Sequence, residues 1–449
     1  MNMREAPSLN SLRSCLEGVI PSVIATVSVE GVPNVTLVSQ VHFVDNRHVA
    51  LSFQFFNKTR ENILANPYAM VQVVDPDTSA HYRLAVKYLR TEGEGPLFEN
   101  MKAKLAGIAS HTGMAKVFHL LGADIYEVLS IEGAHCERLP CALPQRSRLA
   151  ALRNALQQLN QCTELDELFD ATLAALQTHF DIRHGMLLMY DQCGDRLYTV
   201  TSCGYEVSGI GAEIPMGTGV IGVAAQQQTP IRIMYMTGQY AYNRAVRENL
   251  LKDNAALALE TEIPFAGLTD PHSQLAAPII LQDKLLGVLY VDSPQDLRFT
   301  YEDEDALMSL ADYLAMRFSQ LQDITENPVV ANTENIATAP IEGQTTVIRH
   351  YAANDSVFIG EEYLIKGVAG AIIWKLLRDF SEQDRTEFSN RELRLDPTLG
   401  LPEIGDNLEA RLILLQKRLL ERCQFLRLEK TGRGRFHLQI DRAIALEEA

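Results

Sequence analysis

The chain has 449 residues, too many for one ordinary hydrophobic core, and this length predicts about two to four domains. Hydrophobic residues make up 47% of the chain and charged residues 22%, a balance that excludes a largely disordered protein. The formal net charge of -17 opposes nucleic-acid binding by the molecule as a whole, so any such binding must come from a local basic segment.

The sequence predicts neither a membrane helix nor a secretory leader. No apolar run approaches the roughly 18 residues that a spanning helix needs, and the amino terminus has no apolar core before a small-residue cleavage site. The seven cysteines are scattered, and none forms a CxxC pair or stands at zinc-finger spacing. We therefore expect a cytoplasmic protein with reduced thiols, no membrane partner and no metal site.

Residues 1–135 are predicted to form a small β-barrel. β-Branched or alternating runs such as PSVIATVSVEG and NVTLVSQVHFV are separated by turn residues. Two helices are expected between the strands, over residues 59–66 and 96–109, and a closing strand follows over residues 124–131. Short strands with helical insertions of this kind are typical of a small barrel.

The run SFQFFNKTRENILANPYAMVQVVD, followed later by GADIYEV, resembles the FMN-binding split-barrel family that includes pyridoxamine 5'-phosphate oxidase. The resemblance covers roughly residues 10–135 and implies FMN as the cofactor. The residues agree with it, because a Lys and an Arg beside a Thr hydroxyl at a helix amino terminus suit a phosphate monoester. The resemblance also places two polar strand residues at the edge of the flavin ring. The predicted cofactor-binding residues are Ser39, Gln40, Asn57, Lys58, Thr59 and Arg60.

Other interpretations of this block stay open. The NKTREN segment can simply cap a helix, with Lys58 and Arg60 in solvent. Some relatives of the barrel bind haem, and His111 and His119 flank the segment GMAKVF, so haem is the alternative cofactor. The oxidases of the family continue past the barrel with further substrate-binding residues, whereas this chain enters a Pro-rich linker at about Glu137. We therefore predict no catalytic residues.

Residues 136–148 are predicted to be a linker, and residues 149–323 a second domain. Helices open and close this domain, and strands such as HGMLLMYDQ and KLLGVLYVDS lie between them, which predicts an α/β sandwich with an antiparallel sheet. The segments GTGVIGVAAQQQTPIRI, PHSQLAAPIILQDKLLGVLYVDS and FTYEDEDALMSLADYLA resemble a GAF domain in their order and spacing. The resemblance implies a small-molecule ligand, with the segment 237–272 as the lid of its pocket.

Leucine stripes on the two flanking helices of this domain are placed either for a parallel dimer bundle or for packing on its own sheet. With the dimers that are common in GAF domains, they lead us to expect a homodimer. The stripes are Leu149, Leu152, Leu156 and Leu159 on the first helix, and Leu307, Leu310, Leu314, Phe318 and Leu321 on the last.

Residues 324–346 are predicted to be a second linker, and residues 347–449 a third domain. Its expected order is a hairpin, three helices and a second hairpin that turns at Thr431-Gly432. This order resembles the winged-helix effector domain of response regulators, without their receiver domain, and implies binding to double-stranded DNA. The three helices are expected at about residues 368–380, 389–394 and 407–423.

The third domain also carries the basic segment that DNA binding requires. Residues 411–442 hold nine Lys or Arg against three acidic residues. An α-helix fits the major groove, where Arg can bond a guanine edge, and a glycine-opened basic hairpin tip suits phosphate or the minor groove. The alternatives are a solvated basic face and a surface that docks on the acidic GAF domain. The predicted DNA-binding residues are Arg411, Lys417, Arg418, Arg422, Lys430, Arg433 and Arg435.

The sequence thus predicts a multi-domain α+β protein with an amino-terminal split β-barrel, a central GAF α/β sandwich and a carboxy-terminal winged helix-turn-helix. The expected function is a ligand- or redox-sensing transcriptional regulator. The first alternative is an FMN-dependent oxidoreductase that the GAF and winged-helix domains regulate. The second is a scaffold in which the winged helix binds protein. The phosphate-loop motif GxxxxGK[ST] is not found in the sequence.

Overall fold

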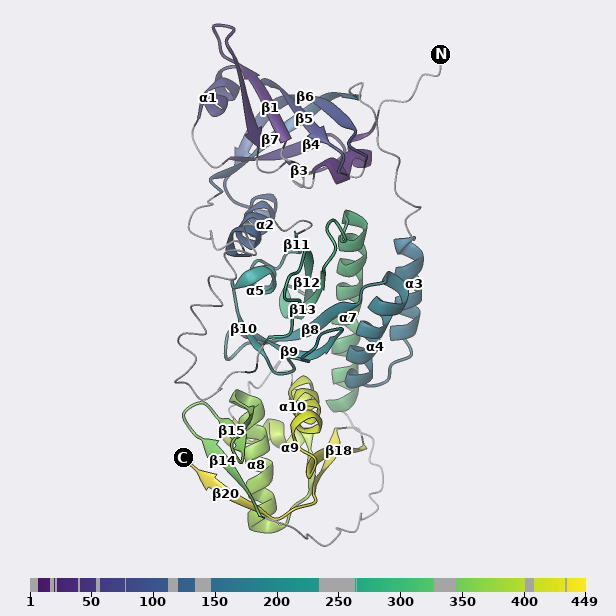
Figure 1. Cartoon of the computed structure of the whole chain (residues 1–449), viewed down its shortest axis with the longest axis vertical. Helices are drawn as coiled ribbons and strands as arrows, with labels where there is room; N and C mark the ends of the chain where they lie inside the picture. Colours follow the sequence, from purple (N-terminus) through teal and green to yellow (C-terminus); the bar gives the residue numbers. More distant parts are fainter. Residues whose placement is uncertain are drawn as a thin grey trace.

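The computed structural model of the chain has three units stacked along its long axis, with the amino-terminal unit at one end and the carboxy-terminal unit at the other (Figure 1). The chain is a multi-domain α+β protein, as its sequence predicts. The structure describes residues 7–16, 20, 22–38, 41–53, 57–76, 78–111, 120–133, 147–233, 263, 265–326, 345–399, 408–432 and 434–449.

The first unit is a curled, seven-stranded antiparallel sheet with helices at its edges. Its elements are η1 (Leu9–Leu16), β1 (Ser22–Val27), β2 (Pro33–Val38), β3 (Val41–Phe43), β4 (His48–Phe53), α1 (Lys58–Ala65), β5 (Tyr68–Val74), β6 (His81–Glu92), α2 (Pro96–His111) and β7 (Gly122–Gly133). The strand order is β2-β1-β5-β6-β7-β4-β3, so β7 returns from the far end of the unit to pair with β4.

The core of this unit follows from the two-residue period of its strands. In β5, Val71 and Val73 are fully buried, and the residues between them face the other side of the sheet. The 3₁₀ helix η1 adds Leu9, Leu12 and Leu16 to the same core, where it packs on β3 and β5. Helix η1 was not predicted from the sequence, because its apolar residues are too few to define a period.

The second unit is an antiparallel sheet between two layers of helices. Its elements are α3 (Arg148–Leu159), α4 (Leu165–Phe180), β8 (His184–Asp191), β9 (Arg196–Cys203), β10 (Glu213–Pro215), α5 (Gly219–Gln227), β11 (Ile231–Ile233), β12 (Ser273–Leu281), β13 (Lys284–Ser293) and α7 (Tyr301–Glu326). Its six strands are ordered β10-β9-β8-β13-β12-β11. Both faces of β8 are covered: Leu187 and Met189 pack with α4 and α7, whereas Met186 and Leu188 pack with α5.

The two leucine stripes predicted in this unit differ in how far they are buried. In the stripe of the first helix, Leu159 is buried as predicted, but Leu149 is 77% exposed, because α3 turns Ala151 and Ala155 inward with Leu159. The stripe of α7 is buried along its length, where the helix packs on β12. This second stripe therefore belongs to the core of its own unit and is not free for a second copy of the chain.

The third unit has a sheet of four strands, a group of helices and a sheet of three strands. Its elements are β14 (Thr346–Tyr351), β15 (Ser356–Ile359), β16 (Glu362–Ile365), α8 (Gly367–Gln383), β17 (Glu387–Ser389), α9 (Asn390–Leu395), η3 (Pro397–Leu399), α10 (Leu408–Arg422), β18 (Leu426–Gly432), β19 (Arg435–Ile440) and β20 (Ile444–Glu448). The sheets are ordered β16-β15-β14-β20 and β17-β19-β18.

Two features of the third unit differ from the sequence-based expectation. The last strand β20 pairs in parallel with β14, and no such strand was predicted. The final hairpin turns after Gly432, which pairs with Arg435, instead of at Thr431-Gly432. A register shift between Lys430 and Gly432 accounts for the displacement, because a bulge moves the turn without changing the flanking pattern. No helix in the described part of the chain is long and apolar enough to span a membrane.

Candidate functional site

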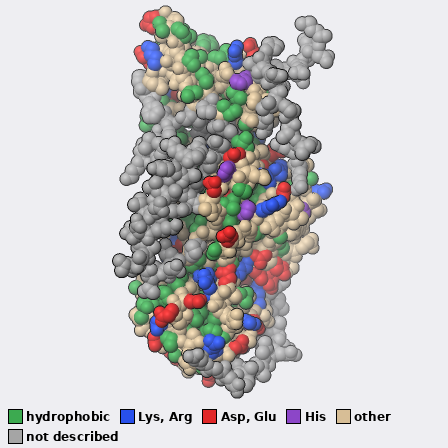
Figure 2. Space-filling view, in the orientation of Figure 1, with side chains coloured by type: hydrophobic (Ala, Val, Ile, Leu, Met, Phe, Trp, Pro, Cys, Tyr) green, Lys and Arg blue, Asp and Glu red, His purple; other side chains and the backbone are tan. Residues whose placement is uncertain are grey.

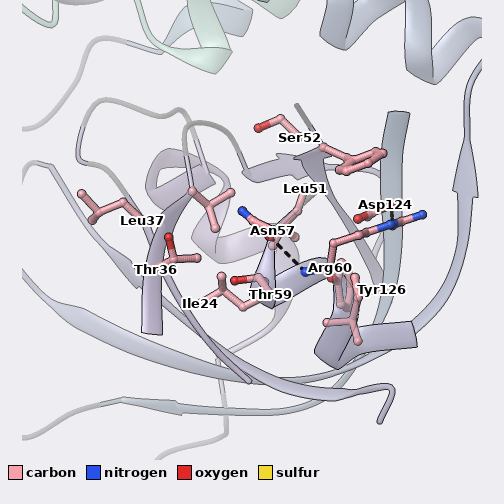
Figure 3. Close-up of a pocket in the computed structure, with 13 residues that line it drawn as sticks. Ile24, Thr36, Leu37, Leu51, Ser52, Asn57, Thr59, Arg60, Asp124 and Tyr126 are labelled. Atoms are coloured by element: carbon pink, nitrogen blue, oxygen red, sulfur yellow. Dashed lines mark hydrogen bonds and ion pairs between the residues drawn. The ribbon is translucent and has the colours of Figure 1, made fainter. Parts of the chain in front are cut away.

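A pocket opens in the first unit at the amino end of α1. It is a hollow of about 550 Å³, with the open solvent at its mouth included. Strands β1, β2, β4 and β7 form its walls with α1, and the side chains converge on it in Figure 3. The lining residues are Ile24, Thr36, Leu37, Val38, Leu51, Ser52, Phe53, Asn57, Thr59, Arg60, Ile63, Asp124 and Tyr126.

Arg60 is the cation of this pocket, and its guanidinium is held in place on several sides. It forms an ion pair with Asp124 of β7, and the two side chains are only 12% and 7% exposed. Its Nη2 donates to Thr91 Oγ1 at 2.8 Å, and the group lies 4.3 Å from the centre of the Phe53 ring. The hydroxyl of Tyr88 lies 2.7 Å from Thr91 Oγ1 and extends the network. The guanidinium is therefore a preorganised donor with a fixed direction.

The first turn of α1 supplies further polar groups to the pocket. Asn57 is the helix cap, and its side-chain oxygen accepts from the backbone N–H of Arg60 at 3.1 Å. The hydroxyl of Thr59 accepts from Asn34 Nδ2 at 2.9 Å. The Ser52 hydroxyl is buried and has no hydrogen-bond partner among the described residues. A buried hydroxyl without a partner is costly in a folded protein, which indicates a place for a polar ligand atom.

The structure brings together only part of the predicted cofactor set. Asn57, Thr59 and Arg60 line the pocket. Lys58 does not, because its side chain is 51% exposed and pairs with Glu61 at 3.2 Å. Ser39 and Gln40 lie outside the described residues, as do the side chains of the alternative haem ligands His111 and His119.

Sequence reasoning missed the other polar residues of the pocket. Thr36 and Ser52 are short side chains on strands, and nothing local distinguishes them. Asp124 could have been found from the sequence, because an acidic residue within an apolar strand needs a partner when it is buried. The neighbouring Tyr126 is also buried, and this burial raises the pKa of its hydroxyl above the ordinary range.

The residues present fit flavin mononucleotide. Arg60 and the hydroxyl of Thr59 stand at the positive end of α1, as a phosphate group requires. The walls beyond them include the apolar side chains of Ile24, Val38 and Leu51, which suit an aromatic ring system. The pairing of Arg60 with Asp124 leaves further N–H donors on the guanidinium, which has five.

The second unit contains a buried polar cluster at the end of β13. Asp292 is 2% exposed, and it accepts from the Tyr205 hydroxyl at 2.9 Å and from the backbone N–H of Leu268 at 3.2 Å. Burial raises the pKa of this carboxyl. Gln274 donates to the hydroxyl of Tyr290 at 2.6 Å in the same interior. Most of the predicted lid lies outside the described residues, so the structure does not define a ligand pocket here.

Several paired charged side chains lie at the boundary between the first and second units. Arg232 Nε lies 2.8 Å from Glu304 Oε2, and Lys104 Nζ lies 3.8 Å from the other oxygen of that carboxylate. Arg13 of η1 pairs with Asp305 at 3.1 Å. Helix α2 packs on α5 along the same boundary. Ion pairs and helix packing therefore hold the two units against each other.

The predicted DNA-binding residues fall into three groups, and one of them faces the second unit. Arg411 is buried, and its Nη2 lies 2.7 Å from Oδ1 of Asp191, the last residue of β8. Lys417 forms an ion pair with Asp170 of α4. Lys430 Nζ lies 2.6 Å from Glu164 Oε2 and 3.2 Å from Asp166 Oδ1. In Figure 2, acidic and basic side chains meet between the central and lower parts of the molecule.

The remaining residues of that set are placed differently. Arg418 is 4% exposed within the third unit, where its Nε donates to the carbonyl of Leu364 at 2.9 Å, and burial lowers its pKa. This position suits a structural role rather than a contact with a ligand. Arg422 and Arg435 are exposed, and Arg433 lies outside the described residues.

The curled barrel and the antiparallel sandwich together define a protein of the split-barrel-plus-GAF class. Residues 10–120 match the family model described as pyridoxamine 5'-phosphate oxidase, and residues 164–318 match the GAF domain model. The chain therefore has a pyridoxamine 5'-phosphate oxidase-like split barrel at its amino terminus, followed by a GAF domain, as the sequence predicts. No curated protein matches this chain.

Several solved structures are similar to parts of the chain. An FMN-binding protein from Syntrophomonas wolfei subsp. wolfei is 18% identical, with a TM-score of 0.25, over 29% of this chain and 88% of its own. The GAF domain of Acinetobacter phosphoenolpyruvate-protein phosphotransferase is 18% identical, with a TM-score of 0.31, over 40% and 98%. The free methionine-R-sulfoxide reductase from Neisseria meningitidis is 18% identical, with a TM-score of 0.31, over 40% and 95%.

Proposed function

We propose that the chain is a flavin-binding regulatory protein whose barrel and GAF domain control a DNA-binding output in the third unit. The observation that carries the proposal is the pocket at the amino end of α1, in a domain that matches a flavin-oxidase family model. A phosphate dianion gains from a fixed guanidinium, a hydroxyl and a helix dipole at one place. When bound, the flavin would supply redox or light-absorbing chemistry.

Each pocket residue has a defined part in this proposal. Arg60 and Thr59 bind the phosphate end of the flavin, and Ser52 donates its unpaired hydroxyl to a polar atom of the ligand. Asp124 is a positioning residue, because it orients Arg60 without needing to touch the ligand. The apolar wall excludes water from the ring system.

The charges between barrel and GAF domain are the proposed route of communication. A ligand shifts a conformational equilibrium only by its differential affinity for the two states. Helix α2 follows directly in the chain after β6, and it packs on α5 of the GAF domain. Asn100 of α2 donates to Thr229 Oγ1 at 2.5 Å, next to the end of α5. Movement of the barrel strands on ligand binding would therefore move a helix that both domains share.

The proposed output is binding to double-stranded DNA through a winged helix. Its support is the order of elements, in which α8, α9 and α10 precede the hairpin of β18 and β19. In this interpretation α10 enters the major groove, and the hairpin with Lys430 and Arg435 contacts phosphates. Arg411, Lys417 and Arg422 are the candidate contacts of the helix, and Arg418 serves to hold α10 on its own unit.

Native mass spectrometry of the purified full chain tests the proposal in one experiment. After FMN is added, we expect one flavin per chain and a homodimer as the main species. The same sample should shift a random-sequence duplex at low salt. A spectrum with no flavin adduct after FMN addition would contradict flavin binding, and a DNA complex that forms at no protein concentration tested would contradict the output.

A further inference from the structure

We propose that the GAF domain masks the DNA-binding face of the third unit, so that DNA binds only after the two separate. The proposal rests on the proposed function of the third unit and adds how that function is regulated. The carboxylates concerned are called the latch carboxylates: Glu164, Asp166, Asp170 and Asp191.

The latch carboxylates pair with cations on both elements that would meet DNA. Asp191 holds Arg411 and Asp170 holds Lys417, and both of these cations belong to α10. The other two latch carboxylates, at the start of α4, hold Lys430 of the hairpin. A lysine or arginine bonds a carboxylate and a phosphate with the same N–H groups. The GAF domain therefore occupies the donors that DNA phosphates would need.

The face of α10 that pairs with the GAF domain is one helical stripe. Arg411, Leu414 and Lys417 are spaced three residues apart and lie on one side of the helix. Leu414 lies beside Gly211 of the GAF domain, where a Cβ built on Gly211 would be 3.6 Å from Leu414 Cδ1. A helix must present its outer stripe to enter a major groove about 12 Å wide. With this stripe covered, α10 cannot enter the groove.

Hollows interrupt the contact between the GAF domain and the third unit. Two hollows lie along it, one of about 740 Å³ near Arg196 and Lys366 and one of about 470 Å³ near Leu165 and Lys430. Residues of both units line each hollow, so the packing between them is interrupted. Buried apolar residues of both units nevertheless form one hydrophobic cluster that includes Leu414, so separation must also expose apolar surface. The ion pairs of Lys417 and Lys430 are partly exposed, so salt weakens them.

Masking predicts a lower apparent DNA affinity, in proportion to the fraction of molecules that are open. The test removes the charge of all four latch carboxylates by isosteric change: E164Q, D166N, D170N and D191N. The matched control removes the same number of charges from exposed carboxylates elsewhere on the GAF domain: E206Q, D283N, E302Q and D312N. Both variants have the same net charge, so a general loss of repulsion from DNA affects them equally.

We expect the latch variant to bind a random-sequence 20-base-pair duplex at least tenfold more tightly than the control variant at low salt, measured by fluorescence anisotropy. Hydrogen exchange of peptides that cover α10 should rise in the latch variant only, which reports separation without DNA. Swapping the charges of one ion pair gives a second test with the same hydrogen-exchange readout. D170K should raise the exchange of α10, because it places two cations together, and D170K with K417E should lower it again.

Different results would overturn masking by the GAF domain and DNA binding by the third unit. Equal DNA affinity of the latch and control variants, with binding detected in both, would overturn masking and leave the DNA-binding function in place. Masking would also be overturned if the hydrogen exchange of α10 is the same in the latch variant as in wild type. If no variant binds DNA although α10 exchange rises, the proposed DNA-binding output is itself wrong.

Discussion

Replacing Arg60 by Met should destabilise the barrel, because Asp124 would then be left as a buried carboxylate without its cation. The two side chains are only 12% and 7% exposed, so water from the pocket would replace the lost partner only in part. Removing one member of a buried ion pair typically costs about 3 to 5 kcal/mol. The Thr91 hydroxyl, which donates to Asp124 at 2.5 Å, offsets part of this loss, so we expect a value near about 3 kcal/mol.

The double variant Arg60→Met with Asp124→Leu provides the matched comparison. Replacing both charges by apolar groups is often close to neutral, so the double variant should recover most of the loss. Hydrogen exchange of the β4 and β7 amides measures the stability of the barrel independently of the stability of the other domains. A cost below about 1 kcal/mol for Arg60→Met, or a double variant as unstable as the single one, would refute the buried pairing.

Three further predictions concern other parts of the molecule. Burial, together with nearby Lys104, lowers the pKa of His42 to about 3; the unfolded chain therefore binds more protons below pH ~6.5, and stability should fall as the pH decreases, at up to about 1.4 kcal/mol per pH unit. The thermal midpoint of His42→Gln should depend less on pH between 7 and 5, and an equal dependence would contradict this assignment. At Gly287, a Cβ would lie 2.1 Å from the carbonyl oxygen of Leu188, so Gly287→Ala should cost about 2 kcal/mol, and an unchanged thermal midpoint would argue against that approach of β13 to β8. Arg435→Ala should lower the slope of log affinity against log salt by about one for every DNA sequence tested, whereas an unchanged slope would exclude this side chain from a phosphate contact.

Local features of the structure were predictable from the sequence. The helix that begins after Asn57 is within one residue of its expected start, because a cap residue and the following charges mark a helix amino terminus in any context. Helix α4 was not predicted, although its buried residues from Leu165 to Phe180 recur at helical spacing. Its pattern was present in the sequence, so α4 could have been found.

Features that depend on pairing over long distances were not predictable. Asp124 reaches the pocket because β7 pairs with β4 and places it opposite Leu51, and no local pattern contains that register. The contacts of Asp170 and Asp191 with α10 depend on how two domains dock. The sequence showed an acidic domain and a basic helix, and docking between them was one of its open alternatives.

The most direct test of the account is a titration of the flavin-free full chain with FMN, followed by flavin fluorescence and compared among wild type, Arg60→Met and Lys58→Met. Lys58 is the matched control, because it is a neighbouring cation whose side chain is exposed and outside the pocket. We predict stoichiometric binding to wild type and Lys58→Met, with a dissociation constant on the order of 1 μM, and at least tenfold weaker binding to Arg60→Met. Equal affinity of the two variants, or no binding by wild type, would contradict the placement of a flavin phosphate at the start of α1.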